Sequence, residues 1–158
     1  MLTKKELFDY IKTKESQYIE FKTSFGKEVI ESVVAFANSY GGYIFIGIKD
    51  NGFINGVEIA SETLKNWINQ IKTNTQPNIL VDMQDFEIDA KTIVAIEVKE
   101  YPIKPIAFKN RYYKRIKNSN HLMSLDEIAN EHLKSINSSW NLNKISNNKF
   151  LIFNWRVA

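Results

Sequence analysis

The chain has 158 residues, of which 44% are hydrophobic, 25% charged and 13% aromatic, and it contains no cysteine. This length accommodates one domain with a sizeable core, and the missing cysteines exclude disulfides, a thiol nucleophile and zinc sites built on thiolates. Lys and Arg exceed Asp and Glu by 21 − 18 = 3, an excess too small to identify a partner by itself.

Hydrophobic periodicity and turn residues predict the elements. Capping-box spacings, Thr3 with Glu6 and Ser124 with Glu127, mark the first and last helices. In chain order we expect a helix over 3–14, a strand over 18–22, a helix over 27–39, a strand over 43–48 with a hairpin partner over 53–57, a helix over 61–74, strands over 79–88 and 92–98, a hairpin over 106–108 and 112–116, and a helix over 124–136.

This order predicts an α/β (α+β) domain over residues 1–137, with a mixed β-sheet flanked by helices. The apolar run 43–48 is typical of a central strand that is buried on both faces. The Asn- and Ser-rich residues 138–158 are predicted as a C-terminal tail. Its last apolar residues, 150–155, would form an edge strand or contact a second subunit.

Three acidic residues, Glu15, Glu20 and Asp50, are candidates for a site. Glu20 shares the polar face of its predicted strand with Lys22, and Asp50 follows the most apolar strand. Carboxylates of this kind could hold Mg²⁺ or Mn²⁺, and Lys22 could stabilise charge on a scissile phosphate. However, a chain with 18 acidic residues contains such triples by chance. On spacing alone we favour ordinary surface acids.

A second feature is basic. The segment 102–120 contains no acid, and aromatic residues lie between its cations. Such a surface suits a phosphate backbone, with rings available to stack on bases, although a lysine-rich edge hairpin protected against aggregation has the same composition. We favour nucleic acid because the acid-free run is long. The cations are Lys104, Lys109, Arg111, Lys114, Arg115 and Lys117, and the aromatic residues are Phe108, Tyr112 and Tyr113.

These residues together resemble the Schlafen/AlbA-like DNA-binding domain family, over roughly residues 6–137. As an ordered set the motifs are specific, although each alone is weak. They are Glu15, Glu20 and Lys22; Asn38, Gly41, Gly42, Gly47, Asp50 and Gly52; Gly56 and Val57; Tyr113, Arg115, Ser119 and Asn120; and Met123, Ser124, Glu127 and Ile128.

The resemblance implies a mixed-sheet α/β domain that binds RNA, including tRNA, or DNA. In the nuclease members of the family two glutamates and an aspartate bind the catalytic metal, and these positions fall on Glu15, Glu20 and Asp50. We therefore expect a Mg²⁺- or Mn²⁺-dependent endoribonuclease without zinc. The backbone would be bound by residues of the final hairpin, namely Lys109, Arg111, Tyr113, Lys114, Arg115, Lys117, Ser119 and Asn120.

The chain departs from the family pattern at two positions. Lys117 stands where many members have glycine, which bears on the hairpin turn near Ser119, and Lys49 replaces a frequent acid beside Asp50. Vertebrate Schlafens build their groove from two lobes, so this single lobe is expected to form a homodimer.

The main alternative is a non-catalytic DNA-binding transcriptional regulator that uses the same basic hairpin. An ATP-binding or protein-interaction module has less support. No apolar stretch approaches the ~20 residues of a membrane span, and acidic residues interrupt the N-terminal segment where a signal peptide would be apolar. We expect a cytoplasmic protein with no membrane partner.

Overall fold

The computed structural model describes residues 1–155, and the side chains of residues 1–140. The chain divides into two units. One comprises Met1–Tyr101 and Ile106–Met123, and the other comprises Pro102–Pro105 and the chain from Ser124 onward. The helices are α1 (Lys4–Thr13), α2 (Lys27–Ala37), α3 (Thr63–Asn74) and α4 (Leu125–Trp155), and the strands are β1 (Ile19–Lys22), β2 (Gly42–Ile46), β3 (Thr75–Gln76), β4 (Asp82–Ile88), β5 (Lys91–Val98), β6 (Ala107–Phe108), β7 (Arg111–Ile116) and β8 (Ser119–Leu122).

The first unit contains two four-stranded sheets, so the α/β prediction is confirmed and a second sheet is added to it. The first sheet has the order β1-β2-β5-β4. Strands β1 and β2 are parallel and are connected through α2, whereas β5 is antiparallel to both β2 and β4, so the sheet is mixed. Parallel neighbours need such a crossover connection.

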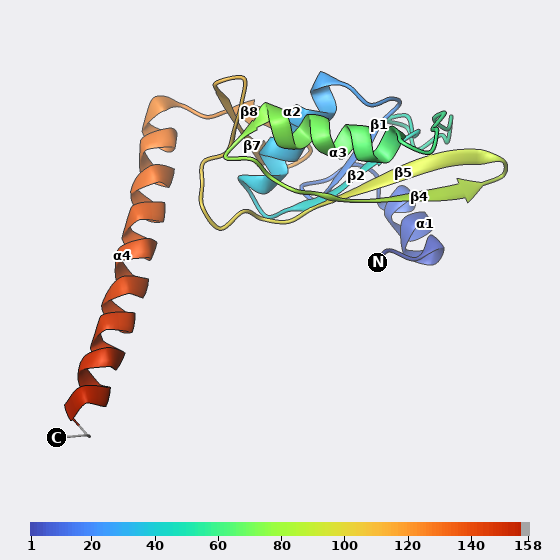
Figure 1. The fold of residues 1–158 in the computed structure, drawn as a ribbon. Coiled ribbons are helices and arrows are strands. Elements are labelled where there is room, and N and C mark those ends of the chain that lie inside the picture. The colour runs from blue at the N-terminus through green and yellow to red at the C-terminus, as the bar shows by residue number, and fades with distance from the viewer. Residues whose placement is uncertain (156–158) are drawn as a thin grey trace. The chain divides into compact units, whose positions relative to one another are not determined.

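The first sheet is covered on both faces, as predicted for its central strand (Figure 1). Ile44 and Ile46 of β2 belong to a core cluster that includes residues of α2 and α3. Phe45, on the opposite face of the same strand, belongs to a second cluster with Leu7 of α1. Alternate residues of a strand point to opposite faces. A strand apolar at every position therefore serves two cores at once.

Two glycines allow the start of β2 to lie close to the neighbouring backbone on both sides. Gly41 has a φ of +71°, and a Cβ atom there would lie 2.5 Å from the carbonyl oxygen of Val98. At Gly42 an added Cβ would meet the Tyr18 carbonyl oxygen. The pair permits the close approach of backbone on both sides, which no larger residue allows.

The second sheet is antiparallel, with the order β3-β6-β7-β8. The predicted hairpin about Lys109 and Asn110 is confirmed, and both residues have a positive φ, as the favoured two-residue turn requires. The turn between β7 and β8 consists of Lys117 and Asn118. Of these two residues only Lys117 has a positive φ, +53°. The hairpin closes with lysine where a type II′ turn favours glycine.

The hairpin predicted after β2 is not formed as expected. Residues 53–57 form no strand, and a single antiparallel bridge joins Ile48 to Ile54. Gly47 and Gly56 both have positive φ values, which interrupts an extended ladder. The helix expected from Ser61 begins at Thr63, and no side chain caps it.

The predicted edge strand over residues 150–155 is also wrong, because α4 continues to Trp155 and crosses the boundary expected at residue 137. Asn and Ser lower helix propensity only modestly, and the segment contains neither glycine nor proline to end a helix. The capping box of Ser124 and Glu127 is confirmed at its start. Within the described part of the chain, no helix combines the length and apolarity that crossing a bilayer requires.

Candidate functional site

The three candidate acids come from three different segments of the fold. Glu15 lies between α1 and β1, Glu20 is the second residue of β1, and Asp50 follows β2. Burial raises the pKa of Glu15, and the negative charges of Glu20 and Asp50 raise it further. The hydrogen bond donated by the Phe21 backbone N–H lowers this pKa but does not cancel the increase. Glu15 is therefore within electrostatic range of both Glu20 and Asp50.

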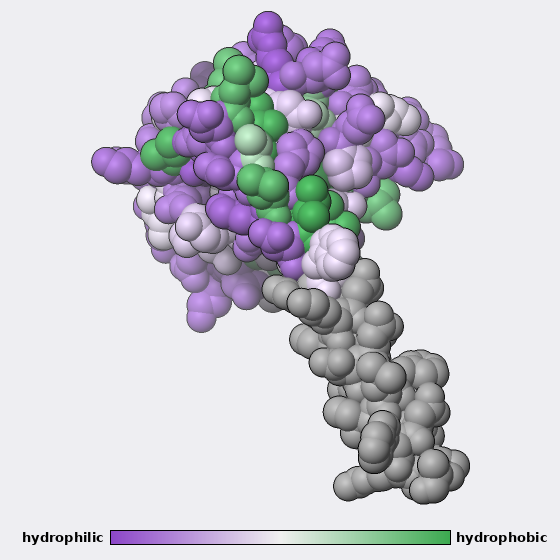
Figure 2. Space-filling view, turned by 90° about the vertical axis from the view of Figure 1, so that its left-hand side faces the viewer, coloured by the Kyte–Doolittle hydropathy of each residue, from purple (hydrophilic) through white to green (hydrophobic). Residues whose placement is uncertain are grey.

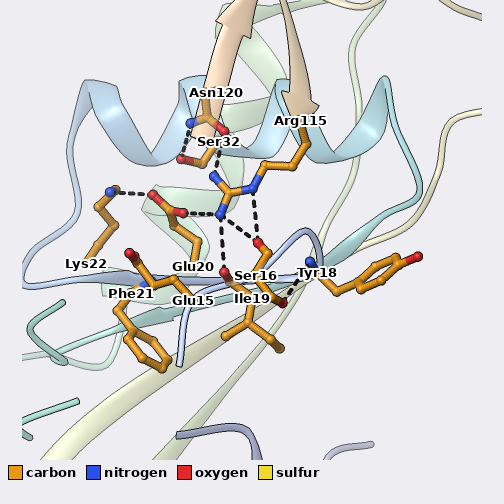
Figure 3. A network of polar contacts seen from close by, with 10 residues as sticks. All are labelled: Glu15, Ser16, Tyr18, Ile19, Glu20, Phe21, Lys22, Ser32, Arg115 and Asn120. Carbon is orange, nitrogen blue, oxygen red and sulfur yellow. Dashed lines mark hydrogen bonds and ion pairs between the residues drawn. The ribbon is translucent and has the colours of Figure 1, made fainter. Parts of the chain in front are cut away.

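Glu20 is engaged by two cations (Figure 3). Its Oε1 lies 2.6 Å from Lys22 Nζ, and its Oε2 lies 2.5 Å from Arg115 Nη2. The Arg115 side chain has no exposed surface and that of Glu20 is 7% exposed. A buried carboxylate requires such partners, since an isolated charge in the interior is costly.

Arg115 connects segments far apart in the sequence. Its Nη2 donates to the carbonyl oxygens of Ser16 and Ile19 at 2.9 and 3.2 Å. Its Nη1 donates to Asn120 Oδ1 at 2.8 Å, and its guanidinium lies 4.9 Å from the centre of the Phe36 ring. The planar, multidentate donor group of arginine suits such a junction. One side chain thus ties β7 to β8, α2 and the start of β1.

The acidic residues as placed do not fit a divalent cation. In the part of the chain whose side chains the structure describes, no group of three His, Asp or Glu side chains could hold a metal ion. Both oxygens of Glu20 already face cations, and Glu15 Oε1 accepts the Phe21 N–H. A hard cation would have to compete with Lys22 and Arg115 for the same oxygens.

The residues predicted to bind the nucleic-acid backbone differ in their exposure to solvent, and only some of them are accessible. Tyr113 and Arg115 are buried, at 7% and 4% exposed, so neither can reach a phosphate from this position. Alternation along β7 turns both of them toward α2, where Tyr113 Oη donates to Glu31 at 3.3 Å. Lys114 and Asn120 are partly buried, whereas Lys109, Arg111, Lys117 and Ser119 are exposed.

Three exposed cations and the partly buried Lys114 define what we call the cationic hairpin surface, made of Lys109, Arg111, Lys114 and Lys117. Lys109 and Lys117 occupy the two turns that flank β7, and Lys114 pairs with His121 across β7 and β8. Figure 2 shows the face of the molecule that includes β7 and β8, which is largely hydrophilic with interspersed hydrophobic residues. Ile116 and Leu122 are exposed apolar residues of this hairpin.

Asn38 was not among the predicted site residues, and in the structure it lies at a junction between α2 and the second sheet. Its buried Nδ2 donates to the carbonyl oxygens of Ile106 and Tyr113, both at 2.8 Å, and its Oδ1 accepts from the Ile106 N–H at 2.6 Å. It therefore fixes the second sheet against the end of α2. Asn38 follows directly after the last residue of the apolar helix α2. A polar side chain at the end of a buried helix needs hydrogen-bond partners, and this was the signal in the sequence.

An exposed ring three residues after Asp50 was also not predicted as part of a site. Phe53 is 55% exposed, and its ring centre lies 5.3 Å from Lys49 Nζ and 4.9 Å from Lys91 Nζ. Lys49, which precedes Asp50 in the sequence, thus contributes to a small cationic and aromatic group with Phe53 and Lys91. Lys91 is more than thirty residues away in sequence, so local patterns could not predict the contact.

Two solved structures resemble this chain. The N-terminal domain of a RecG-related protein from Nitrosomonas europaea, named in relation to an ATP-dependent DNA helicase, has 28% identity and a TM-score of 0.57 over 79% of this chain and 95% of that one. The DIP2311 protein from Corynebacterium diphtheriae has a TM-score of 0.58 over 78% of this chain at 19% identity, which supports the fold alone. This chain spans 23% of the length of DIP2311.

No curated protein matches the chain. The family described as "Schlafen, AlbA_2" matches residues 15–124, which is more than half of the sequence. The match includes Glu15, Glu20, Asp50 and the whole cationic hairpin surface. The chain therefore belongs to the Schlafen AlbA_2 family.

Proposed function

We propose that this domain binds nucleic acid through the cationic hairpin surface. The observation that carries the proposal is the exposure of Lys109, Arg111 and Lys117 on one short antiparallel unit, within a segment that contains no acid from residue 102 to 120. Cations grouped without intervening acids attract phosphates and release their counterions. The buried Arg115 takes no part in the contact and instead holds the hairpin in place.

The family and one structural relative support this proposal. The relative from Nitrosomonas europaea carries a name that relates it to a DNA helicase, and its domain is covered almost completely by this chain. We infer DNA as the first partner to test, with RNA as the alternative. Exposed Phe53 and its two lysines add a ring on which an unpaired base could stack.

Fluorescence anisotropy with labelled duplex DNA, single-stranded DNA and tRNA tests the proposal. The variant Lys109→Ala/Arg111→Ala/Lys117→Ala is compared with Lys5→Ala/Lys65→Ala/Lys72→Ala, which removes the same charge from exposed positions on α1 and α3. We expect the hairpin variant to lose at least about tenfold in affinity and the control to lose little. Equal losses, or no binding by the unaltered protein, would exclude this surface.

A metal-dependent endoribonuclease is the second candidate, because Glu15 lies within electrostatic range of Glu20, Asp50 and Lys22, and Lys22 pairs with Glu20. The ion pairs of Glu20 weigh against it. The test is incubation of tRNA with Mn²⁺ and either the unaltered protein or Asp50→Ala. Cleavage that only the unaltered protein performs supports the enzyme. Binding that survives Asp50→Ala and EDTA, without cleavage, supports the non-catalytic regulator.

A further inference from the structure

The aromatic residues of the basic segment are not available for stacking on a base. Phe108 and Tyr113 are only 2% and 7% exposed, and Tyr112 is partly buried. Residues 107–122 therefore present no exposed Phe, Tyr or Trp ring. Two exposed rings that are connected to this hairpin come from other segments of the first unit. They belong to Tyr18 and Tyr40, which are 52% and 63% exposed.

Tyr18 and Tyr40 lie together beside the hairpin. Their ring centres are 6.4 Å apart and their planes are tilted by 56°, so the rings do not cover each other face to face. Arg115 joins both segments to β7. Its Nη2 donates to the Ser16 carbonyl oxygen at 2.9 Å, and its backbone N–H donates to Ser39 Oγ at 2.8 Å. Figure 3 shows that the Tyr18 ring points away from this network.

The backbone holds both tyrosines in place. The carbonyl oxygen of Tyr18 accepts a hydrogen bond from the Tyr43 N–H at 2.8 Å. Tyr40 is followed by Gly41, which has a φ of +71° and donates its N–H to the Phe36 carbonyl oxygen at 2.9 Å. A ring on an ordered backbone loses little conformational entropy when a ligand binds, which favours affinity.

One short strand of nucleic acid can reach both the tyrosines and the hairpin cations. Tyr40 directly follows Ser39, and Lys117 lies two residues beyond Arg115. Because a hydrogen bond joins Ser39 to Arg115, the Cα atoms of Tyr40 and Lys117 are at most about 18 Å apart. Single-strand sites in other proteins span roughly 4–16 nucleotides. A strand of this length can place phosphates on the cations and bases on the rings.

We propose that Tyr18 and Tyr40 form a base-stacking site for unpaired nucleotides, so that single-stranded DNA or RNA is the class of ligand that uses the whole surface. The site rests on the proposed function, because the hairpin cations supply the attraction for phosphate that the rings supplement. Bases of a duplex are already paired and stacked, whereas unpaired bases can lie on an aromatic ring. Every base has a π-face, so the site tolerates any sequence.

Fluorescence anisotropy with chains of equal charge tests the site. A labelled oligothymidylate of about 16 nucleotides is compared with an abasic chain of the same length, which carries the phosphates without the bases. Oligouridylate and its abasic analogue form the RNA pair. We expect the unaltered protein to bind the chain with bases at least about tenfold more tightly. A preference in either pair supports the site. Its absence from both pairs overturns the site and leaves the hairpin surface standing, whereas no binding of any chain or duplex overturns both.

Variants connect the preference to the two rings. Tyr18→Ala/Tyr40→Ala should lose most of it while binding the abasic chain and duplex DNA as before, with an unchanged salt dependence, because no phosphate contact is removed. Tyr18→Phe/Tyr40→Phe retains the rings and should retain the preference. Phe8→Ala removes a 41% exposed ring from α1 and should change nothing. Equal weakening of chains with and without bases by the alanine variant, or loss of the preference in the phenylalanine variant, overturns the site.

Discussion

Arg115 and Glu20 form a buried ion pair across 95 residues of sequence, with Nη2 and Oε2 2.5 Å apart. The arginine belongs to the hairpin that carries the exposed cations, and the glutamate belongs to the acidic group at the edge of the first sheet. The pair therefore couples the two candidate sites physically. The same contact that orders the cationic hairpin also occupies a carboxylate that a metal would need.

Removing the arginine should destabilise the fold strongly. Arg115→Met leaves the buried Glu20 with one cation, Lys22, instead of two, and removes the donor to the carbonyl oxygens of Ser16 and Ile19, so we expect a loss of about 3 kcal/mol in the free energy of unfolding. Urea denaturation measures it. Arg111→Met is the matched control, because Arg111 is exposed on the same strand, and it should change stability little. Similar losses for both variants would contradict a special role for Arg115.

Glu15 should make stability depend on pH. Burial raises the pKa of its carboxyl in the folded state, so the folded protein binds more protons than the unfolded chain between the ordinary glutamate pKa of about 4.3 and the raised value. Stability therefore falls as pH rises through this window. Glu15→Gln should unfold at a higher urea concentration than the unaltered protein at pH 7, and the difference should shrink toward pH 4. A less stable variant at pH 7 would contradict this.

Asn38 should be sensitive to truncation. Asn38→Ala leaves two carbonyl oxygens and one N–H without the partners that the side chain supplies, and buried polar groups without partners cost roughly 1–3 kcal/mol each before relaxation or water entry. We expect a loss of about 2–4 kcal/mol in unfolding free energy. Asn66→Ala, at an exposed position of α3, should be nearly neutral. A neutral Asn38 variant would show that water replaces the side chain.

The salt dependence of binding should report the hairpin cations individually. Each phosphate contact that is removed should lower the slope of log affinity against log salt by about 0.9 for duplex DNA and about 0.7 for single strands. We therefore expect Lys109→Ala and Lys117→Ala to reduce the slope measured by anisotropy titrations at several salt concentrations. Unchanged slopes with weaker binding would indicate an indirect, structural effect of these lysines.

Local signals predicted the elements that depend on neighbours in sequence. The capping boxes, the turn at Lys109 and Asn110 and the doubly buried strand β2 each follow from residues within a few positions of one another. The roles of Tyr113 and Arg115 could not be predicted in this way. Both lie in a basic run, and only their partners on α2 and before β1, more than 75 residues away, reveal that β7 turns them inward.

The extent of α4 shows a different limit. A segment rich in Asn and Ser is typical of a loop. However, residues 137–155 contain no glycine or proline that would end a helix. A helix that is already capped at Ser124 can be extended at little cost in free energy. The arrangement of the acidic residues could be predicted only in part. Their proximity could be expected from the parallel strands, but the ion pairs that occupy Glu20 could not.

Lys117 holds its turn with a positive φ, a conformation that costs an L-amino acid about 1 kcal/mol and glycine almost nothing. The chain thus keeps a charge at the tip of the hairpin at the expense of backbone strain. Lys117→Gly should raise the melting temperature while weakening binding to DNA, so that conformational stability and affinity move in opposite directions. At this turn glycine would suit the backbone conformation better, whereas lysine suits the binding of a polyanion, and the chain has lysine.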